Sequence, residues 1–442
     1  MPKRHTCSRA SRRDYLAGLT LGAVTAAGCL SFGGNGSENG QPASAGSESS
    51  PSDSNGSSDS DPSPEDNDSD SGSTQTIPAG EMFHCDLQNT GRVPSDVGRR
   101  AGLSVEWEFT APGGTISSTP VIADGIVYVG CDDSNLYAVD ASTGEQQWQF
   151  TTGDSIKSSP ALIDGRIYVG SDDHSIYAID TASGEEVWSF ETDRAVVSSP
   201  KVKDGTVFVG SNDGNLYALE SQTGDLEWSY GTGAAIQSAP AVNNKTIYAG
   251  NDDGSLYALD LVDGQVSWSF DEPIAAVTAA PVVDENTVYL GVERGFVYAI
   301  DIESKYKTKK WRYSTKAGVT GSPALGDERL HVPDNGNRLT AVNTSDGSAA
   351  WTAEVVDGIA TPATLGDRSV YVGHGTDGGA NVLSLFSTGD SDADDESDSS
   401  TEGQQAVSVT IGYRVTTAPL VTSDKVIVGT DGATLVAASA PF

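Results

Sequence analysis

The sequence has few positive charges. Lys and Arg number 26 against 62 Asp and Glu in 442 residues, which gives a formal net charge of −36 at pH 7. Such a surface repels the phosphates of nucleic acids and excludes a polybasic attachment to anionic lipids. Beyond the N-terminus, no apolar run approaches the ~20 residues of a membrane-spanning helix. The composition therefore excludes nucleic-acid-binding proteins and helical membrane bundles.

Motifs for metal binding and nucleophilic catalysis are also lacking. The chain has four Cys and five His, with no CxxC or HExxH spacing among them, so we expect no metal site. No GxSxG elbow of a hydrolase occurs either. His174, His331 and His374 occur singly, in or near expected loops, and we interpret them as surface or structural residues.

The first 28 residues have the organisation of an export signal. A basic start precedes an apolar stretch at residues 16–28, which is too short to span a membrane but suits a signal h-region. Arg12-Arg13 is typical of a twin-arginine signal, and Ala26-Ala27-Gly28-Cys29 is typical of a lipobox. The alternative is an amphipathic N-terminal helix. We predict that residues 1–28 are removed and that Cys29 is lipidated.

Residues 29–80 are rich in Ser, Gly, Asp, Asn and Pro. Within them, residues 31–80 contain nine acidic residues and no basic one. Such a segment buries too little apolar surface to offset its chain entropy, and its charges repel one another and extend it. We predict a disordered tether that holds a folded domain away from a membrane.

Beyond residue 100 the sequence repeats about every 40 residues. Seven tryptophans lie 41, 40, 40, 40, 43 and 40 residues apart, and a proline follows each by about twelve residues. An eighth proline, Pro419, follows Val407, where the tryptophan has been lost. The tryptophans are Trp107, Trp148, Trp188, Trp228, Trp268, Trp311 and Trp351.

Each repeat contains four short runs of apolar, β-branched or aromatic residues, separated by Asp and Gly turn residues. In the second repeat these runs fall within residues 156–190. Four antiparallel strands in about 40–45 residues make one blade of a β-propeller. We place the small residues before each proline, such as Ser158 and Ser159, in the innermost strand, because small side chains suit the crowded axis.

The phase of the repeat predicts how the ring closes. Residues 105–109 precede the first proline run and form a lone fourth strand, whereas residues 414–439 supply only three strands. Pairing these two segments completes the last blade and removes two open edges. We therefore predict an all-β, eight-bladed β-propeller over residues 81–442, with the N-terminal strand closing the last blade.

The repeat resembles a known family. Ala-Ile-Asp-x-x-Ser-Gly-Glu-x-x-Trp-x-Phe at residues 178–190 resembles the tryptophan-docking motif of quinoprotein-like (PQQ-like) eight-bladed propellers, and residues 138–150 and 258–270 match it too. Residues 82–91 resemble the segment that often leads into the first blade of such domains. The resemblance covers residues 81–442 and implies that the tryptophans dock one blade on the next.

The family includes dehydrogenases and non-catalytic scaffolds. Its quinone-dependent dehydrogenases place a Trp beneath the cofactor and typically form a disulfide between two adjacent Cys above it. Here all seven Trp lie on the repeat period, and no two Cys are adjacent. We therefore expect no cofactor, neither PQQ nor calcium, and no catalysis.

Two Cys remain after the signal and the lipobox are set aside. In an oxidising compartment, Cys85 and Cys131 are candidates for a disulfide. The alternative is two independent buried thiols.

Paired acidic residues recur in four repeats. Clustered carboxylates favour calcium, whereas Asp and Asn also suit hairpin turns because they cap their own backbone. Recurrence in four blades favours turns, since one calcium site does not need four copies. The pairs are Asp132-Asp133, Asp172-Asp173, Asn212-Asp213 and Asp252-Asp253.

Two junctions depart from the repeat. Residues 301–311 have two extra residues and begin a basic cluster, which is either a solvated outer loop or a docking patch for an acidic partner. Residues 387–405 form an acidic, Ser-rich insertion that we expect to be disordered. The basic cluster comprises Lys305, Lys307, Lys309, Lys310 and Arg312.

The sequence thus predicts a cell-surface, lipid-anchored, non-catalytic binding or assembly scaffold with a protein partner, similar to the outer-membrane-assembly lipoproteins of the family. It is expected at the outer face of the cytoplasmic membrane. The alternatives are a PQQ-dependent dehydrogenase and a small-molecule or sugar receptor that uses the central channel. Most of the negative charge falls on the propeller, which is typical of halophilic proteins.

Overall fold

The computed structural model describes residues 82–98, 102–272, 275–355, 358, 361–375, 381–388 and 402–440. All of them belong to one compact unit, Ser73–Phe442. The predicted signal, the predicted lipidation site Cys29 and the predicted tether lie outside the described residues. Within the described ranges, no helix is long and apolar enough to cross a membrane.

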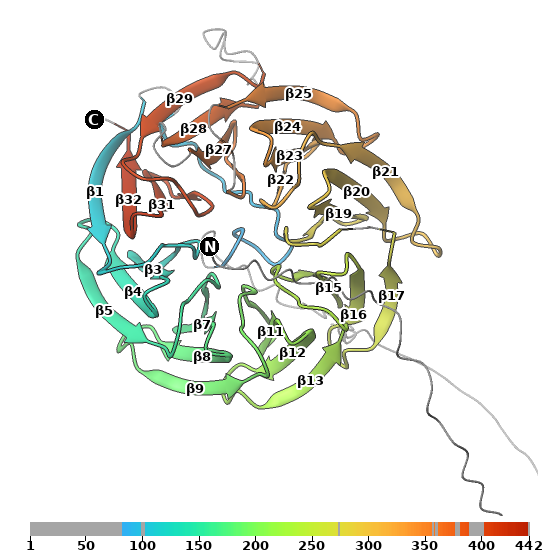
Figure 1. Cartoon of the computed structure of the whole chain (residues 1–442), viewed down its shortest axis with the longest axis horizontal. Helices are drawn as coiled ribbons and strands as arrows, with labels where there is room; N and C mark the ends of the chain where they lie inside the picture. Colours follow the sequence, from blue (N-terminus) through green and yellow to red (C-terminus); the bar gives the residue numbers. More distant parts are fainter. Residues whose placement is uncertain are drawn as a thin grey trace, which may run out of the picture. The chain divides into compact units, whose positions relative to one another are not determined.

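Thirty-two strands form eight four-stranded antiparallel sheets, which are the blades of a β-propeller (Figure 1). The predicted all-β, eight-bladed fold is therefore confirmed. Blade 1 comprises β2 (Val121–Ala123), β3 (Ile126–Gly130), β4 (Asn135–Asp140) and β5 (Gln146–Thr151); blade 2, β6 (Ala161–Ile163), β7 (Arg166–Gly170), β8 (Ser175–Asp180) and β9 (Glu186–Glu191); blade 3, β10 (Lys201–Lys203), β11 (Thr206–Gly210), β12 (Asn215–Glu220) and β13 (Leu226–Gly231).

The remaining blades follow the same order from the innermost to the outermost strand. Blade 4 comprises β14 (Ala241–Asn243), β15 (Thr246–Gly250), β16 (Leu256–Asp260) and β17 (Val266–Phe270); blade 5, β18 (Val282–Val283), β19 (Thr287–Val292), β20 (Phe296–Asp301) and β21 (Lys309–Ser314); blade 6, β22 (Ala324–Leu325), β23 (Arg329–Asp334), β24 (Arg338–Asn343) and β25 (Ala349–Glu354); blade 7, β26 (Thr364–Leu365), β27 (Ser369–His374), β28 (Val382–Ser387) and β29 (Gln405–Thr410); blade 8, β30 (Leu420–Val421), β31 (Lys425–Gly429), β32 (Thr434–Ser439) and β1 (Ser104–Thr110).

The two ends of the repeat region meet in blade 8. Strand β1 pairs antiparallel with β32 from Ser104↔Ser439 to Thr110↔Thr434. Trp107 and Phe109 on β1 are both buried in a cluster with residues of blades 1 and 8. The predicted closure of the ring by the N-terminal strand is thus confirmed, and β1 completes the four-stranded sheet of blade 8.

Burial along each blade follows from its position in the ring. The two middle strands, such as β7 and β8, are covered on both faces by neighbouring blades, so their runs are almost continuously apolar and buried. The outermost strand, such as β9, alternates exposed polar positions with the tryptophan position. The hydrophobic core therefore lies between the blades, as a series of clusters around the ring.

The small residues before each proline do not form the innermost strands, so this expectation was wrong. Each innermost strand begins after the proline, as in β6 (Ala161–Ile163), because proline has no N–H to donate to the sheet. The preceding hydroxyl residues instead bond the next blade. The Thr119 N–H donates to Ser159 Oγ at 2.9 Å, and the Ser159 N–H donates to Ser199 Oγ at 3.0 Å.

Six of the seven docking tryptophans, all except Trp268, pack on a glycine of the next blade. The Trp148 indole donates to the Thr181 carbonyl at 3.0 Å, and a Cβ built on Gly184 would lie 2.7 Å from the indole ring. Gly184 has φ +70°, which glycine adopts without strain. The same packing joins Trp107 to Gly144, Trp188 to Gly224, Trp228 to Gly264, Trp311 to Gly347 and Trp351 to Gly403.

We expect Gly184→Ala to lower the free energy of unfolding by about 3 kcal/mol, because the methyl group overlaps the indole and the residue has a left-handed backbone. Gly205→Ala is the matched control. Gly205 has φ +83°, and a Cβ added there would meet no atom within 4 Å, so its loss should be about 1 kcal/mol. Urea unfolding measures the free energy of unfolding of both variants. Equal losses in the two would show that the contact between tryptophan and glycine contributes little.

The acidic insertion in blade 7 is narrower than predicted. Gly403 takes the glycine position beneath Trp351, with φ +72°. Ser387 ends β28 and Gln405 begins β29, so both predicted boundary residues lie in strands. Residues 389–401 lie outside the described residues.

Candidate functional site

The acidic pairs lie in the turns between the second and third strands of blades 1 to 4. Asp173 accepts a hydrogen bond from the Ser175 N–H at 2.9 Å and another from the Tyr177 hydroxyl at 2.7 Å. Asp133 and Asp213 make the corresponding bonds in their own hairpins. These carboxylates therefore hold turns, and within the described ranges no three acidic, His or Cys residues are grouped for a metal.

The two cysteines are free thiols, so the disulfide left open from the sequence is not formed in the structure. They lie in different clusters: Cys131 is in the core between blades 8 and 1, whereas Cys85 contacts a cluster of blades 7 and 8. Burial raises the pKa of each thiol to about 12. Both are therefore protonated and unreactive at neutral pH.

Two of the three histidines have local roles. His174 lies in a turn of blade 2 with φ 79°. His374 ends β27 and is buried, and its Nε2 is 2.7 Å from Ser384 Oγ on the neighbouring strand. The third, His331, lines a pocket.

Three residues of the basic cluster contact blade 5 and the segment that follows blade 4. Lys309 forms an ion pair with Glu272, and Lys310 Nζ donates to Thr287 Oγ1 at 2.8 Å. The Arg312 guanidinium lies 4.6 Å from the centre of the Phe296 ring. These contacts hold part of the cluster against blade 5 and the segment after blade 4, and the docking patch stays a prediction.

Residues 82–97, here called the lead-in segment, run across the inner strands of several blades. In Figure 1 this blue segment crosses the middle of the ring before the chain enters β1. Its backbone carbonyls accept hydrogen bonds from the innermost strands of blades 4, 5, 6 and 7. The bonds are Val242 N–H to Leu87 O, Val283 N–H to Gln88 O, Leu325 N–H to Thr90 O and Leu365 N–H to Gly91 O, at 2.7–3.0 Å.

Asn89 fixes the middle of the lead-in segment. The side chain is fully buried, and its Nδ2 donates to the carbonyls of Pro240 and Pro281 at 3.1 and 3.0 Å. These prolines belong to adjacent blades, so one amide joins two blades and the segment. Asn89 has φ 58°, which asparagine tolerates better than most residues.

Lys201 holds the start of the lead-in segment, and sequence reasoning missed it. It begins β10, is 0% exposed, and donates from Nζ to the carbonyls of Phe83 and Asp86. Desolvation lowers the pKa of Lys201 to about 8, against the opposing effect of the Asp86 carboxylate. In the other seven blades the residue after the proline is Ala, Val or Leu. Aligning the repeats on their prolines would have revealed this buried lysine.

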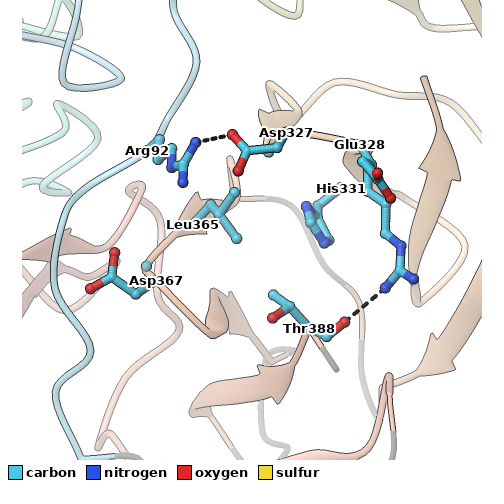
Figure 2. Close-up of a pocket in the computed structure, with 10 residues that line it drawn as sticks. Arg92, Asp327, Glu328, His331, Leu365, Asp367 and Thr388 are labelled. Carbon is cyan, nitrogen blue, oxygen red and sulfur yellow. Dashed lines mark hydrogen bonds and ion pairs between the residues drawn. The ribbon is translucent and has the colours of Figure 1, made fainter. Parts of the chain in front are cut away.

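A pocket of about 400 Å³ lies between blades 6 and 7, beside the lead-in segment (Figure 2). Its rim carries the ion pair of Arg92 and Asp327, and Figure 2 shows His331 on the opposite side of the pocket from Arg92. Arg329, which also lines it, donates to the Thr388 carbonyl at 2.8 Å. The other lining residues are Gly326, Glu328, Leu365, Gly366 and Asp367.

His331 is 2% exposed, and neither ring nitrogen makes a hydrogen bond of normal geometry. Desolvation lowers its pKa to about 4, against a weaker opposing effect of the Ala324 carbonyl. His84, in the lead-in segment, is equally buried, and desolvation lowers its pKa to about 4 as well. Both imidazoles are therefore neutral at physiological pH.

These two histidines make stability depend on pH. Their pKa rises from about 4 to about 6.5 on unfolding, so the unfolded chain binds more protons between these values. Stability is complete above pH 6.5 and falls as the pH drops toward 4. We expect a change from pH 7.5 to 5 to cost about 2 kcal/mol for each histidine. Urea unfolding at both pH values measures this loss of unfolding free energy, and His331→Tyr should remove about half of it.

The fold and its blade contacts define a propeller of PQQ-like repeats, as the resemblance implied. The profile of the family described as outer membrane protein assembly factor BamB matches residues 89–203, 172–305 and 305–441. These matches cover well over half of the chain, and the chain belongs to this family. No curated protein matches it.

Solved structures of two kinds share the fold. BamB from Moraxella catarrhalis is 15% identical with a TM-score of 0.63, over 76% of this chain and 99% of that one. Quinohemoprotein alcohol dehydrogenase from Comamonas testosteroni is 16% identical with a TM-score of 0.66, over 82% and 80%. A europium-containing methanol dehydrogenase is 13% identical with a TM-score of 0.66, over 82% and 98%. At these identities the likenesses show the fold and do not separate a scaffold from a dehydrogenase.

Proposed function

We propose that the protein is a non-catalytic binding and assembly scaffold, anchored by a lipid on Cys29 and exposed outside the cytoplasmic membrane. The single observation that carries this proposal is how two buried donors near the ring axis, the Lys201 ammonium and the Asn89 amide NH₂, are used. Lys201 and Asn89 both donate to backbone carbonyls of the protein itself. Their hydrogen bonds rigidify the disc rather than face a substrate.

The same observation argues against a bound quinone. A quinone cofactor carries carboxylates that need charged or hydrogen-bonding partners, and the two buried donors described near the axis already have partners. Six tryptophans pack on glycines of the next blade, which leaves them on the blade junctions rather than at the axis. The family assignment to an assembly factor supports the scaffold as well.

Titration of the purified full chain with PQQ in the presence of calcium tests the proposal. We expect no stoichiometric uptake by equilibrium dialysis and no reduction of an artificial electron-accepting dye when alcohols are added. A quinone-dependent alcohol dehydrogenase run in parallel shows that the assay works. Tight one-to-one uptake together with dye reduction would overturn the scaffold in favour of the enzyme.

We also propose that the protein works in concentrated salt, because its net charge is −36 and most of that charge lies on the propeller. Self-repulsion of this kind destabilises the folded state, and salt shortens its range from about 10 Å at 0.1 M to about 3 Å at 1 M. We expect Tm to rise steeply as KCl is raised to molar concentrations. A Tm that does not change with KCl would contradict the halophilic assignment.

A further inference from the structure

At several junctions the indole of the docking tryptophan donates to a carbonyl of the next blade, and in blades 2 and 6 an arginine begins the second strand beside it. In blade 2, three donors converge on the Ser221 carbonyl of blade 3. They are the Tyr168 hydroxyl at 3.1 Å, the Trp188 indole at 2.9 Å and the Arg166 guanidinium at 3.1 Å. Ser221 directly follows the third strand of its blade, β12. Each of these three side chains therefore has a hydrogen-bond partner at this junction.

The junction between blades 6 and 7 has the same set with one change. Arg329, Trp351 and Thr388 take the corresponding positions, and His331 stands where blade 2 has its tyrosine. Arg329 still donates to the Thr388 carbonyl at 2.8 Å. The shorter His331 side chain, however, makes no such bond, and the buried Nε1 of Trp351 has no partner either.

The pocket of about 400 Å³ occupies this junction. Two of the residues that line it carry buried polar atoms without a hydrogen-bond partner: both ring nitrogens of His331 and the hydroxyl of Thr388. Both residues are 2% exposed. The great majority of buried polar groups in proteins have a hydrogen-bond partner, and one that has none needs an explanation. A ligand that supplies the missing partners is such an explanation.

The chemistry of these atoms selects the ligand. A neutral imidazole offers one donor and one acceptor, and a threonine hydroxyl offers both functions on one atom. Alcohol groups, which both donate and accept, complement this set. At the rim, Arg92 is paired with Asp327 and Arg329 with Glu402, which leaves the lining carboxylates of Glu328 and Asp367 in excess and disfavours an anion.

We propose that the pocket between blades 6 and 7 binds a small uncharged molecule with several hydroxyl groups, such as a monosaccharide or a polyol. Leu365 on the pocket wall provides apolar contact for the C–H face of a sugar ring. This site lies at a blade junction, apart from the ring axis. The proposed sugar or polyol site does not depend on the scaffold proposal, since a scaffold and an enzyme could each hold such a ligand between two blades.

The indole N–H resonances of the full chain, followed by ¹H–¹⁵N NMR, test the proposal. The Trp351 ring centre is 5.6 Å from that of His331, so its indole signal reports on the pocket. The probes are glucose, mannose, N-acetylglucosamine and glycerol, with acetate, phosphate and choline as charged comparisons. We expect saturable shifts of the Trp351 signal with at least one sugar or polyol, at a Kd of about 1 mM or tighter.

Two variants separate binding from folding. His331→Tyr restores the residue found in the neighbouring repeats, so it should fold normally, fill the pocket and abolish the shift. Thr388→Val keeps the shape and removes one hydroxyl, which should weaken binding about tenfold. Tyr248→Phe, at a junction without this histidine, is the control and should bind as the wild type does. Three results would each overturn the proposal. They are no saturable shift with any of the four hydroxylated probes, a response to a charged probe instead, and unchanged binding by His331→Tyr.

Discussion

Deletion of residues 103–109 is expected to abolish folding of the propeller. Strand β1 (Ser104–Thr110) pairs with β32 along its length, and its Trp107 and Phe109 are buried in the core shared by blades 8 and 1. Truncation of a buried Phe or Trp alone costs about 3–5 kcal/mol. Loss of both, together with five of the six residue pairs between β1 and β32, is as large as the typical total stability of about 5–15 kcal/mol.

The deletion would also expose the edge of β32, which is a template for aggregation. We therefore expect insoluble protein, or a soluble species without a cooperative thermal transition by circular dichroism. Two controls make the test specific. Removal of residues 31–72 should leave Tm unchanged, and a circular permutant with residues 103–110 moved behind residue 442 should recover the fold. A deletion variant that unfolds cooperatively near the wild-type Tm would show that blade 8 does not need β1.

Lys201→Met is expected to release the lead-in segment from the ring. Lys201 Nζ is the hydrogen-bond donor for the carbonyls of Phe83 and Asp86, and its charge interacts with the partly buried Asp86 carboxylate. Removing one partner of a buried ion pair costs about 3–5 kcal/mol, because the remaining charge then has no opposite charge or hydrogen-bond donor to offset its desolvation. Methionine matches the length of the lysine stem, so the change is electrostatic rather than one of volume.

The loss should be local. We expect hydrogen exchange to accelerate at Val242 and Val283, whose N–H groups donate to the lead-in segment, and limited proteolysis to cleave near Asp86. Lys203→Met, two residues further along the same strand and only half-buried, is the matched control and should have little effect. Adding Asp86→Asn to Lys201→Met should restore part of the stability. Equal stability of the two single variants would contradict the role given to Lys201.

The fold was predictable because its determinants are repeated along the chain. The tryptophan and proline periods gave the number of blades, and the phase of the first and last runs gave the closure through β1, as the β1–β32 pairing shows. The prediction of the innermost strands was wrong, because small residues near the axis do not by themselves define a strand. They instead precede a proline, and their hydroxyls bond the next blade.

The site was less predictable because it depends on departures from the repeat. Lys201 and His331 each replace a residue type that recurs in the other blades, and neither stands out in a motif search. The partners of Lys201 lie more than 110 residues away in sequence, in the lead-in segment. The pocket beside His331 depends on Arg92 and Thr388, which the fold alone brings together. Repeat alignment identifies the unusual positions, and the structure shows what they contact.

The proteins that co-purify with the full-length chain from membranes of its own host test the central claim most directly. The comparison is with a Cys29→Ser variant, which cannot be lipidated, and each co-purifying protein is quantified relative to the bait by mass spectrometry. A scaffold should retain one or a few membrane-associated proteins near one-to-one stoichiometry, and the variant should lose them. A wild-type chain that retains no protein above the level of the variant would contradict the scaffold.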